Sequence, residues 1–142
     1  MFERAKAGLV LVIASVLLGA CTEVGTHQNA MPTQADGAAF FGENCASCHG
    51  SDGRGMSASS AGLSQSPRDL TTLSAENGGT FPAARALSYI YGDPDNGHLA
   101  RVMPQFGPEM AEDLVPIEID GVLTPTPREL AGLLAYLESI QR

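Results

Sequence analysis

The stretch Cys45-Ala46-Ser47-Cys48-His49 holds two cysteines separated by two residues and followed directly by a histidine. This spacing is typical of c-type haem attachment, because two thiols in one tight turn can add to the two vinyl groups on one edge of the macrocycle. His49 would then lie under the iron and offer an imidazole nitrogen as the proximal ligand. The stretch predicts one haem c, attached covalently through Cys45 and Cys48 and ligated by His49.

Three other interpretations of this motif stay open at this point. A Cys-x-x-Cys pair can be half of a zinc site, although no second cysteine pair follows and the other histidines are only His27 and His98. It can be a redox dithiol, although no alternation of strands and helices surrounds it. A structural disulfide is a third interpretation, and it leaves the adjacent histidine unexplained.

The first 20 residues differ from the rest of the 142-residue chain. Two basic residues precede a short apolar run over 9–18, which is typical of an export signal and short for a membrane span. The sequence Leu18-Gly19-Ala20-Cys21 resembles the bacterial lipobox, in which the cysteine becomes the lipidated first residue. We expect a lipoprotein signal peptide over 1–20, a lipid anchor on Cys21 and a place on the periplasmic side of a bacterial membrane. The alternative is ordinary cleavage that leaves Cys21 as a free thiol.

The chain that follows Cys21 is acidic. Residues 22–142 keep 15 of the 16 Asp and Glu side chains and six of the eight Lys and Arg side chains, a formal net charge of −9. All six of those cations are arginine. Nucleic acid is therefore not an expected partner, since phosphate contacts need a basic surface. Docking by charge would need redox partner proteins with a basic surface, and a solvated acidic surface is an equally good explanation.

The hydrophobic pattern predicts a flexible tether over 21–35 and one domain over 36–142. Asp36 is expected to be the N-cap of a helix over 37–45 that runs into the haem motif. Helical spacing predicts a second helix over 83–91, which starts at Pro82 and ends at Gly92. A third helix follows Pro127, with leucines along one stripe.

Shorter elements are expected between these helices. One helical turn is predicted over 67–73, and a short helix over 109–114. Residues 116–124 alternate around Asp120-Gly121, which is typical of a small hairpin.

A haem iron with one histidine needs a sixth ligand or keeps an open site, and this choice separates electron transfer from catalysis. Met56 lies only seven residues after His49, so it would hardly reach the opposite face. Met103 is a better candidate than Met110 because Pro104 restricts it to an extended backbone that can present the thioether. The alternative role for any methionine is core filler.

These motifs together resemble the class I (mitochondrial-type) bacterial monohaem cytochromes c over 36–142. The resemblance implies an all-α fold with three main helices around one covalently bound haem. It rests on the haem motif with Gly50, on the segment Met103-Pro104-Gln105-Phe106, and on helix-crossing residues. In that family the first and last helices cross, which implies that Gly37 and Phe41 meet Leu133 and Tyr136. The chain departs from the family in lacking lysine after Cys21 and in its 115–125 segment.

Further residues are expected around the haem, the first of them from the resemblance. A proline carbonyl of the loop near Pro67 is expected to accept the imidazole N–H. Arg68 and His98 are candidates to meet a propionate, with a solvated surface role as the alternative. The expected pocket wall consists of Phe41, Leu70, Leu87, Phe106 and Leu133.

The function that the sequence predicts is one-electron transfer in the bacterial envelope, with haem iron held by His49 and Met103 and no catalytic residues. The alternatives are a haem-bearing subunit of a larger respiratory or dehydrogenase complex and an open-site haem enzyme such as a peroxidase. No small-molecule substrate is expected for the electron carrier, because both axial positions are filled.

Overall fold

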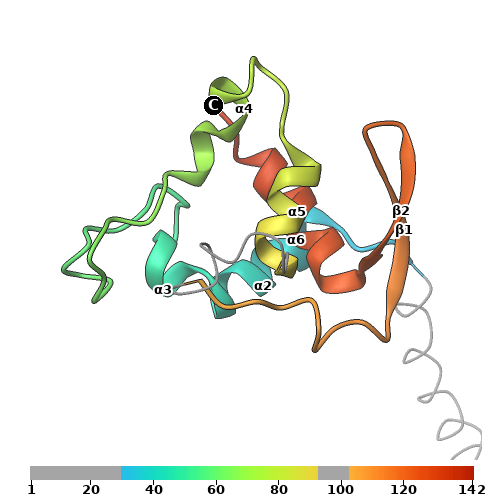
Figure 1. The fold of residues 1–142 in the computed structure, drawn as a ribbon, viewed down its shortest axis with the longest axis horizontal. Helices are drawn as coiled ribbons and strands as arrows, with labels where there is room; N and C mark the ends of the chain where they lie inside the picture. Colours follow the sequence, from blue (N-terminus) through green and yellow to red (C-terminus); the bar gives the residue numbers. More distant parts are fainter. Residues whose placement is uncertain (1–29, 93–102) are drawn as a thin grey trace, which may run out of the picture. The chain divides into compact units, whose positions relative to one another are not determined.

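The described residues, 30–92 and 103–142 of the computed structural model, contain five α-helices and one two-stranded antiparallel sheet (Figure 1). Residues 31–142 form one compact unit. The predictions for the signal peptide, for Cys21 and for the tether up to residue 29 lie outside the described residues. In chain order the elements are α2 (Gln34–Asn44), α3 (Ala46–His49), a 3-10 turn η1 (Leu70–Thr72), α4 (Leu73–Glu76), α5 (Ala83–Tyr91), β1 (Leu114–Ile119), β2 (Val122–Pro127) and α6 (Arg128–Ser139).

Helix α2 starts three residues earlier than predicted. Thr33 is its N-cap: the Thr33 hydroxyl accepts a hydrogen bond from the Asp36 backbone N–H at 3.3 Å, and the Asp36 carboxylate accepts one from the Thr33 N–H at 2.7 Å. This reciprocal pair is a capping box. The prediction of Asp36 as the N-cap is therefore wrong, because its carboxylate serves as the third residue of the helix. Gln34 and Ala35, assigned above to the tether, belong to α2.

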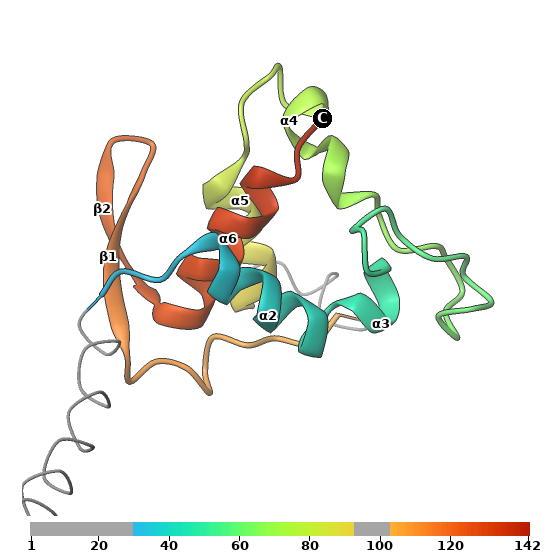
Figure 2. The same cartoon turned by 180° about the vertical axis from the view of Figure 1, so that it is seen from behind.

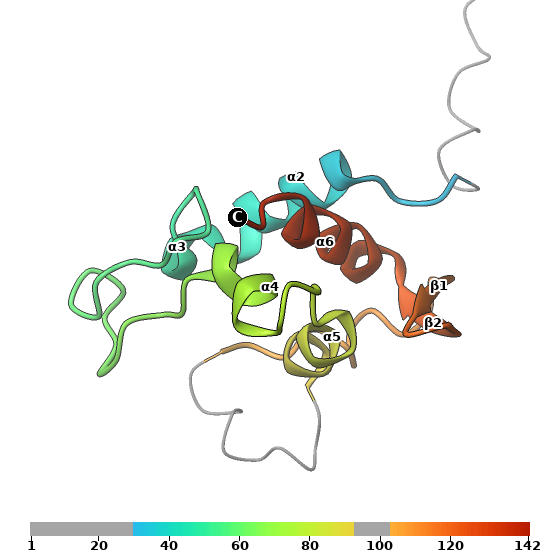
Figure 3. The same cartoon turned by 90° about the horizontal axis from the view of Figure 1, so that it is seen from above.

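Helices α2 and α6 cross each other, as Figures 2 and 3 show from two sides. Gly37 and Gly132 lie at the crossing. A Cβ on Gly37 would lie 1.9 Å from the carbonyl oxygen of Gly132, so only glycine permits this approach. Next to the crossing, the rings of Phe41 and Tyr136 lie with centroids 5.2 Å apart, and Leu133 is fully buried. The predicted meeting of these residues is confirmed.

The core lies along the inner stripe of α6. Leu130, Leu133 and Leu137 are buried there with Phe41 of α2 and Ile90 of α5. Full burial of each such side chain stabilises the fold by about 1.5–3 kcal/mol relative to exposure. The three longest helices thus share one apolar centre, and the sites described below surround it.

Helix α5 has the predicted bounds. Pro82 precedes it, and Gly92 ends it with a φ of +98°, a left-handed conformation that favours glycine. The helical turn predicted over 67–73 starts later, at Leu70, and continues to Glu76 as η1 and α4.

The predicted hairpin is present and is longer than expected. Strands β1 and β2 pair in antiparallel register from Leu114 opposite Pro127 to Ile119 opposite Val122, and Asp120 and Gly121 form the turn, both with positive φ. The short helix expected over 109–114 is wrong. Residues 107–113 form turns, and Leu114 opens β1 because pairing with β2 outweighs the weak local helical pattern.

The hairpin is largely buried along one face and exposed at its tip. Val115, Ile119 and Thr126 are buried, whereas Val122 and Leu123 near the tip are 62% and 69% exposed. Across residues 30–92 and 103–142, no helix has both the length and the hydropathy needed to cross a membrane.

Candidate functional site

The two motif cysteines lie in one tight turn between α2 and α3. The Cys45 carbonyl accepts hydrogen bonds from the backbone N–H groups of Cys48, at 3.1 Å, and of His49, at 2.9 Å. Cys45 itself donates its N–H to the carbonyl of Phe41, so the turn is attached directly to the core helix. This geometry places both thiols within a single helical turn, as attachment to one edge of a macrocycle requires.

Both thiols are free and half-buried. Burial raises the pKa of Cys45 to about 11, and the neighbouring Cys48 contributes to the same rise. Before haem is attached, the Cys45 side chain is therefore a protonated thiol rather than a thiolate at neutral pH.

The imidazole of His49 is oriented by a backbone carbonyl. Its Nδ1 lies 3.3 Å from the carbonyl oxygen of Arg68. A carbonyl can only accept, so Nδ1 carries the proton and Nε2 keeps its lone pair for a metal. Desolvation by burial lowers the pKa of His49, with the Arg68 hydrogen bond opposing that shift, so the neutral ring is favoured. The carbonyl expected from a proline is therefore that of Arg68, one residue beyond Pro67.

The loop after His49 folds back so closely that glycine is required. A Cβ on Gly55 would lie 2.5 Å from the Pro67 carbonyl oxygen, and the φ of Gly55 is +86°. The Gly55 N–H donates to the His49 carbonyl at 2.7 Å, and Leu70 N–H donates to the Gly53 carbonyl at 2.7 Å. Residues 53–55 and 67–70 therefore lie side by side, which carries the Arg68 carbonyl to the imidazole.

Apolar side chains from several elements gather around the motif and the core. The expected wall residues all belong to this group: Phe41 and Leu133 are fully buried, while Leu70, Leu87 and Phe106 are partly exposed. Partly buried residues that complete the group are Phe40, Cys45, Ala46, Phe81, Met103, Met110, Tyr136 and Ile140. We refer to this set as the apolar wall.

The segment that carries Met103 is fixed to the end of α5. Phe106 and Gly107 donate their N–H groups to the carbonyls of Ile90 and Tyr91, each at 3.0 Å. The Phe106 ring also meets Phe40 of α2 edge to face, with centroids 5.7 Å apart. Met103 is half-buried in the apolar wall, as are Cys45 and Leu87 of α5.

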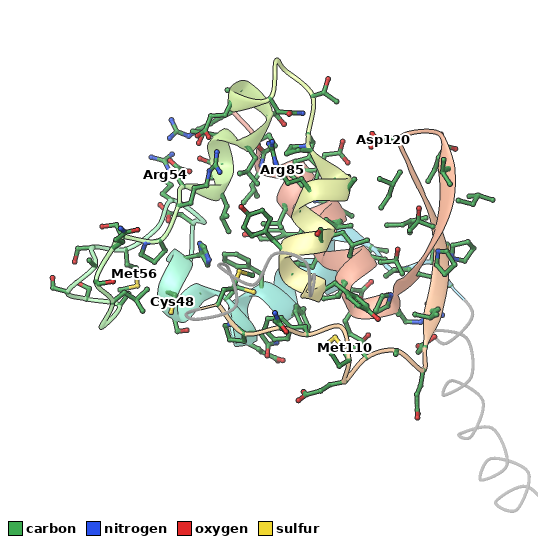
Figure 4. The ribbon with its side chains drawn as sticks, in the orientation of Figure 1. Cys48, Arg54, Met56, Arg85, Met110 and Asp120 are labelled. Carbon is green, nitrogen blue, oxygen red and sulfur yellow. The ribbon has the colours of Figure 1, made fainter. Side chains whose placement is uncertain are left out.

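Met56 and Met110, the other methionines compared with Met103 as iron ligands, lie elsewhere in the fold. Met56 lies in the loop after His49, and Figure 4 shows it on the side of α3 that faces away from α5 and α6. Met110 also belongs to the apolar wall, but Figure 4 places it well away from Cys48, near the turns that lead to β1.

The cytochrome c family model matches residues 34–141. The chain belongs to the cytochrome c family. No curated protein and no solved structure gives a significant match. Members of this family are generally electron carriers rather than enzymes, and they bind haem c covalently. The cytochrome accordingly attaches one haem c through Cys45 and Cys48.

The residues present fit this group. A flat, largely apolar macrocycle needs two adjacent thiols, a neutral imidazole and a partly exposed apolar surface. The cytochrome supplies the thiols in one turn, His49 with Nε2 free, and the apolar wall. Among the described residues, no group of three or more His, Cys, Asp and Glu side chains is arranged to hold a metal ion.

Of the two residues expected to meet a haem propionate, the structure describes only Arg68. The Arg68 guanidinium forms an ion pair with Glu76, and both side chains are about half exposed. His98 lies outside the described residues.

Three contributors to the site were missed by the sequence analysis. Gly132 had a signal, since a glycine within an otherwise strong helix indicates close packing. Phe40 precedes the predicted Phe41, and its position beside the Met103 segment depends on long-range packing. The Arg68 carbonyl had no signal in the sequence, because every residue carries a backbone carbonyl.

Proposed function

We infer that this cytochrome is a one-electron carrier whose haem iron is ligated by His49 and Met103. The observation that carries this proposal is that Cys45 and Met103, 58 residues apart in the sequence, pack against the same apolar core. Haem c, when bound, supplies a one-electron ferric/ferrous couple.

Each named residue has a distinct task in this proposal. Cys45 and Cys48 hold the macrocycle covalently. His49 donates from Nε2 while its Nδ1–H is held by Arg68. Met103 supplies a soft thioether, which favours ferrous iron and raises the potential, and the apolar wall acts in the same direction by excluding water. If His49 and Met103 both ligate the iron, it would have no free place for a substrate, which argues against a peroxidase.

The proposed place of action is the periplasmic side of a bacterial membrane. It is supported by the export signal and lipobox-like sequence that end at Cys21, which would make residues up to about 33 a tether to a lipid anchor. Cys21→Ser should release the protein from the membrane fraction into the soluble periplasmic fraction. Retention in the membrane would contradict the lipid anchor. Subunits that co-purify stably in mild detergent would favour the complex-subunit alternative.

The ligand proposal is tested with a matched pair of variants. Met103→Ala should abolish the methionine–iron charge-transfer band of the oxidised protein and open the iron to CO. Met110→Ala removes a side chain of the same kind from the same apolar wall and should keep the band. Loss of the band in Met110→Ala with retention in Met103→Ala would overturn the assignment. A high-spin wild-type protein that binds CO rapidly would overturn the carrier function itself.

A further inference from the structure

Gln141 and Arg142, which follow the C-cap Ile140 of α6, bind the loop that lies beside His49. The Gln141 side-chain amide donates from Nε2 to the carbonyls of Leu70, at 2.8 Å, and of Leu137, at 2.7 Å. Its Oε1 accepts a hydrogen bond from the Ser74 N–H at 2.8 Å. One amide therefore joins the end of α6 to Leu70 of η1 and to Ser74 of α4.

Arg142 binds the same part of the chain, where it contacts the Asp69 carboxylate and the Thr71 hydroxyl. Its Nε donates to Thr71 Oγ1 at 2.8 Å, its Nη2 donates to Asp69 Oδ2 at 2.9 Å, and its backbone N–H donates to the Thr71 carbonyl at 3.1 Å. Thr71 is buried and donates both its N–H and its hydroxyl to Asp69 Oδ1. We call Gln141 and Arg142 together the α6-end clamp.

The clamped segment continues directly into the carbonyl that orients His49. Arg68, which bears this carbonyl, precedes Asp69 in the chain. The neighbouring loop segment 53–55 is held as well. The Leu70 N–H donates to the Gly53 carbonyl, and a Cβ on Gly53 would lie 2.9 Å from Ile140 Cδ1. The residues at the end of α6 thus contact both loop segments, 53–55 and 67–70, that bring the Arg68 carbonyl to the imidazole.

We propose that the α6-end clamp positions the Arg68 carbonyl against His49 Nδ1 and thereby sets the reduction potential of the cytochrome. The proposal rests on His49 as the axial ligand. A hydrogen bond from Nδ1–H to a carbonyl makes the imidazole a stronger donor, which stabilises ferric iron and lowers the potential. At 3.3 Å the bond is longer than the usual 2.9–3.0 Å, so a small displacement of Arg68 breaks it.

The sign of the potential shift separates this role from plain electrostatics. Arg142→Gln removes a cation, and by Coulomb's law alone this stabilises the more positive ferric state and lowers the potential. Loosening the clamp has the opposite effect, because a weaker Nδ1 hydrogen bond raises the potential. Gln141→Met keeps the side-chain length and changes no charge. We expect a positive shift for Gln141→Met in protein-film or solution voltammetry, and for Arg142→Gln a shift more positive than that of its control.

The control is Arg128→Gln, which removes the same charge at the other end of α6, where Arg128 pairs with Asp113. It should show the Coulomb effect alone. A second readout is the solvent exchange of the His49 Nδ1 proton, followed by NMR in the reduced protein, which should be faster in Gln141→Met than in wild type. Lower thermal stability without a change in potential or exchange would overturn the proposal and leave the clamp a structural role.

Two further outcomes are decided in advance. If Arg142→Gln fails to assemble, Arg142→Lys keeps the charge and loses the paired Nε and Nη2 donors; a positive shift supports the clamp and no shift contradicts it. Failure of His49 ligation would be visible separately, as an oxidised wild-type spectrum without low-spin histidine–methionine features. An intact spectrum with unchanged potentials in all clamp variants would overturn the clamp alone.

Discussion

The segments that carry His49 and Met103 are held in different ways. The orientation of the His49 ring is fixed directly, because its Nδ1–H donates a hydrogen bond to the Arg68 carbonyl. The loop around the ring is also fixed, because its two backbone segments pack against each other. Met103 is positioned through its neighbours, because Phe106 and Gly107 hydrogen-bond to α5 and Gly107 packs against the Tyr91 ring. The histidine side should therefore tolerate substitution less well than the methionine side. The predictions below test this difference.

The largest effect is expected from His49→Gly, which removes the ring and its bond to Arg68. We expect a loss of holoprotein on the order of tenfold or more, and loss of the low-spin spectrum in what remains. Haem-stained gels and absorption spectra measure both, and added imidazole should restore the low-spin form. Arg68→Ala is the matched control, because it keeps the backbone carbonyl and should assemble normally. An unchanged spectrum in His49→Gly would mean that another residue ligates the iron.

Gly55→Ala comes next in size. The added Cβ meets the Pro67 carbonyl at 2.5 Å in a left-handed conformation, so steric crowding of about 1–3 kcal/mol adds to backbone strain of about 1–2 kcal/mol. Gly62→Ala has a similar positive φ with nothing within 4 Å, so it should carry the strain alone. Denaturant unfolding of the holoprotein measures both. Equal losses in the two variants would show that the close approach of the two loop strands contributes nothing.

Gly107→Ala is expected to cost less, about 1–2 kcal/mol of unfolding free energy. Its Cβ would meet the Tyr91 ring at 2.4 Å, and that ring is partly exposed and can rotate away. The methionine–iron band should weaken on warming at a lower temperature than in wild type. Gly42→Ala is the control within α2, with nothing within 4 Å, and it should stabilise the protein by about 0.5–1 kcal/mol. A loss for Gly107→Ala larger than that for Gly55→Ala would reverse the comparison.

The smallest effect concerns pH. Hydrogen bonds from the Thr71 hydroxyl and N–H, together with Arg142, lower the pKa of Asp69 below its usual 3.8. The ionised carboxylate is favoured by folding, so its contribution is complete above about pH 4 and is lost as the pH falls through the lower folded pKa. The thermal midpoint of wild type should fall more steeply below pH 4 than that of Asp69→Asn. Parallel curves for the two proteins would show that the ionised Asp69 carboxylate, which Arg142 of the clamp contacts, adds nothing to stability.

Local signals predicted most of the helical frame. Pro82 and Gly92 bracket α5 because proline suits a helix start and glycine suits a left-handed end, and both are properties of single residues. The start of α2 was misassigned because Thr33 and Asp36 are both good N-caps, and only the reciprocal hydrogen bonds distinguish the cap from the third residue. The prolines of β1 and β2 concealed the full length of the hairpin, since proline is unusual within strands.

For the candidate site, the motif predicted where haem attaches, and the structure added how the histidine is oriented. Met103 as a ligand stays a prediction, supported by its place in the apolar wall. The Arg68 carbonyl and the α6-end clamp could not have been found from local patterns. A backbone carbonyl leaves no signature in a sequence, and Gln141 and Arg142 act on residues about 70 positions earlier in the chain.

The paired prolines of the hairpin have a consequence for how the cytochrome behaves at high concentration. Pro116 lies opposite Pro125, and Pro127 lies opposite Leu114. Because proline cannot donate to its cross-strand partner, these are pairs whose N–H positions face outward, towards the free edges of the ribbon. Each edge therefore lacks donors that a third strand would need. An edge that lacks these donors is a poor template for self-association, so the domain can reach high concentration without joining its neighbours into a growing sheet.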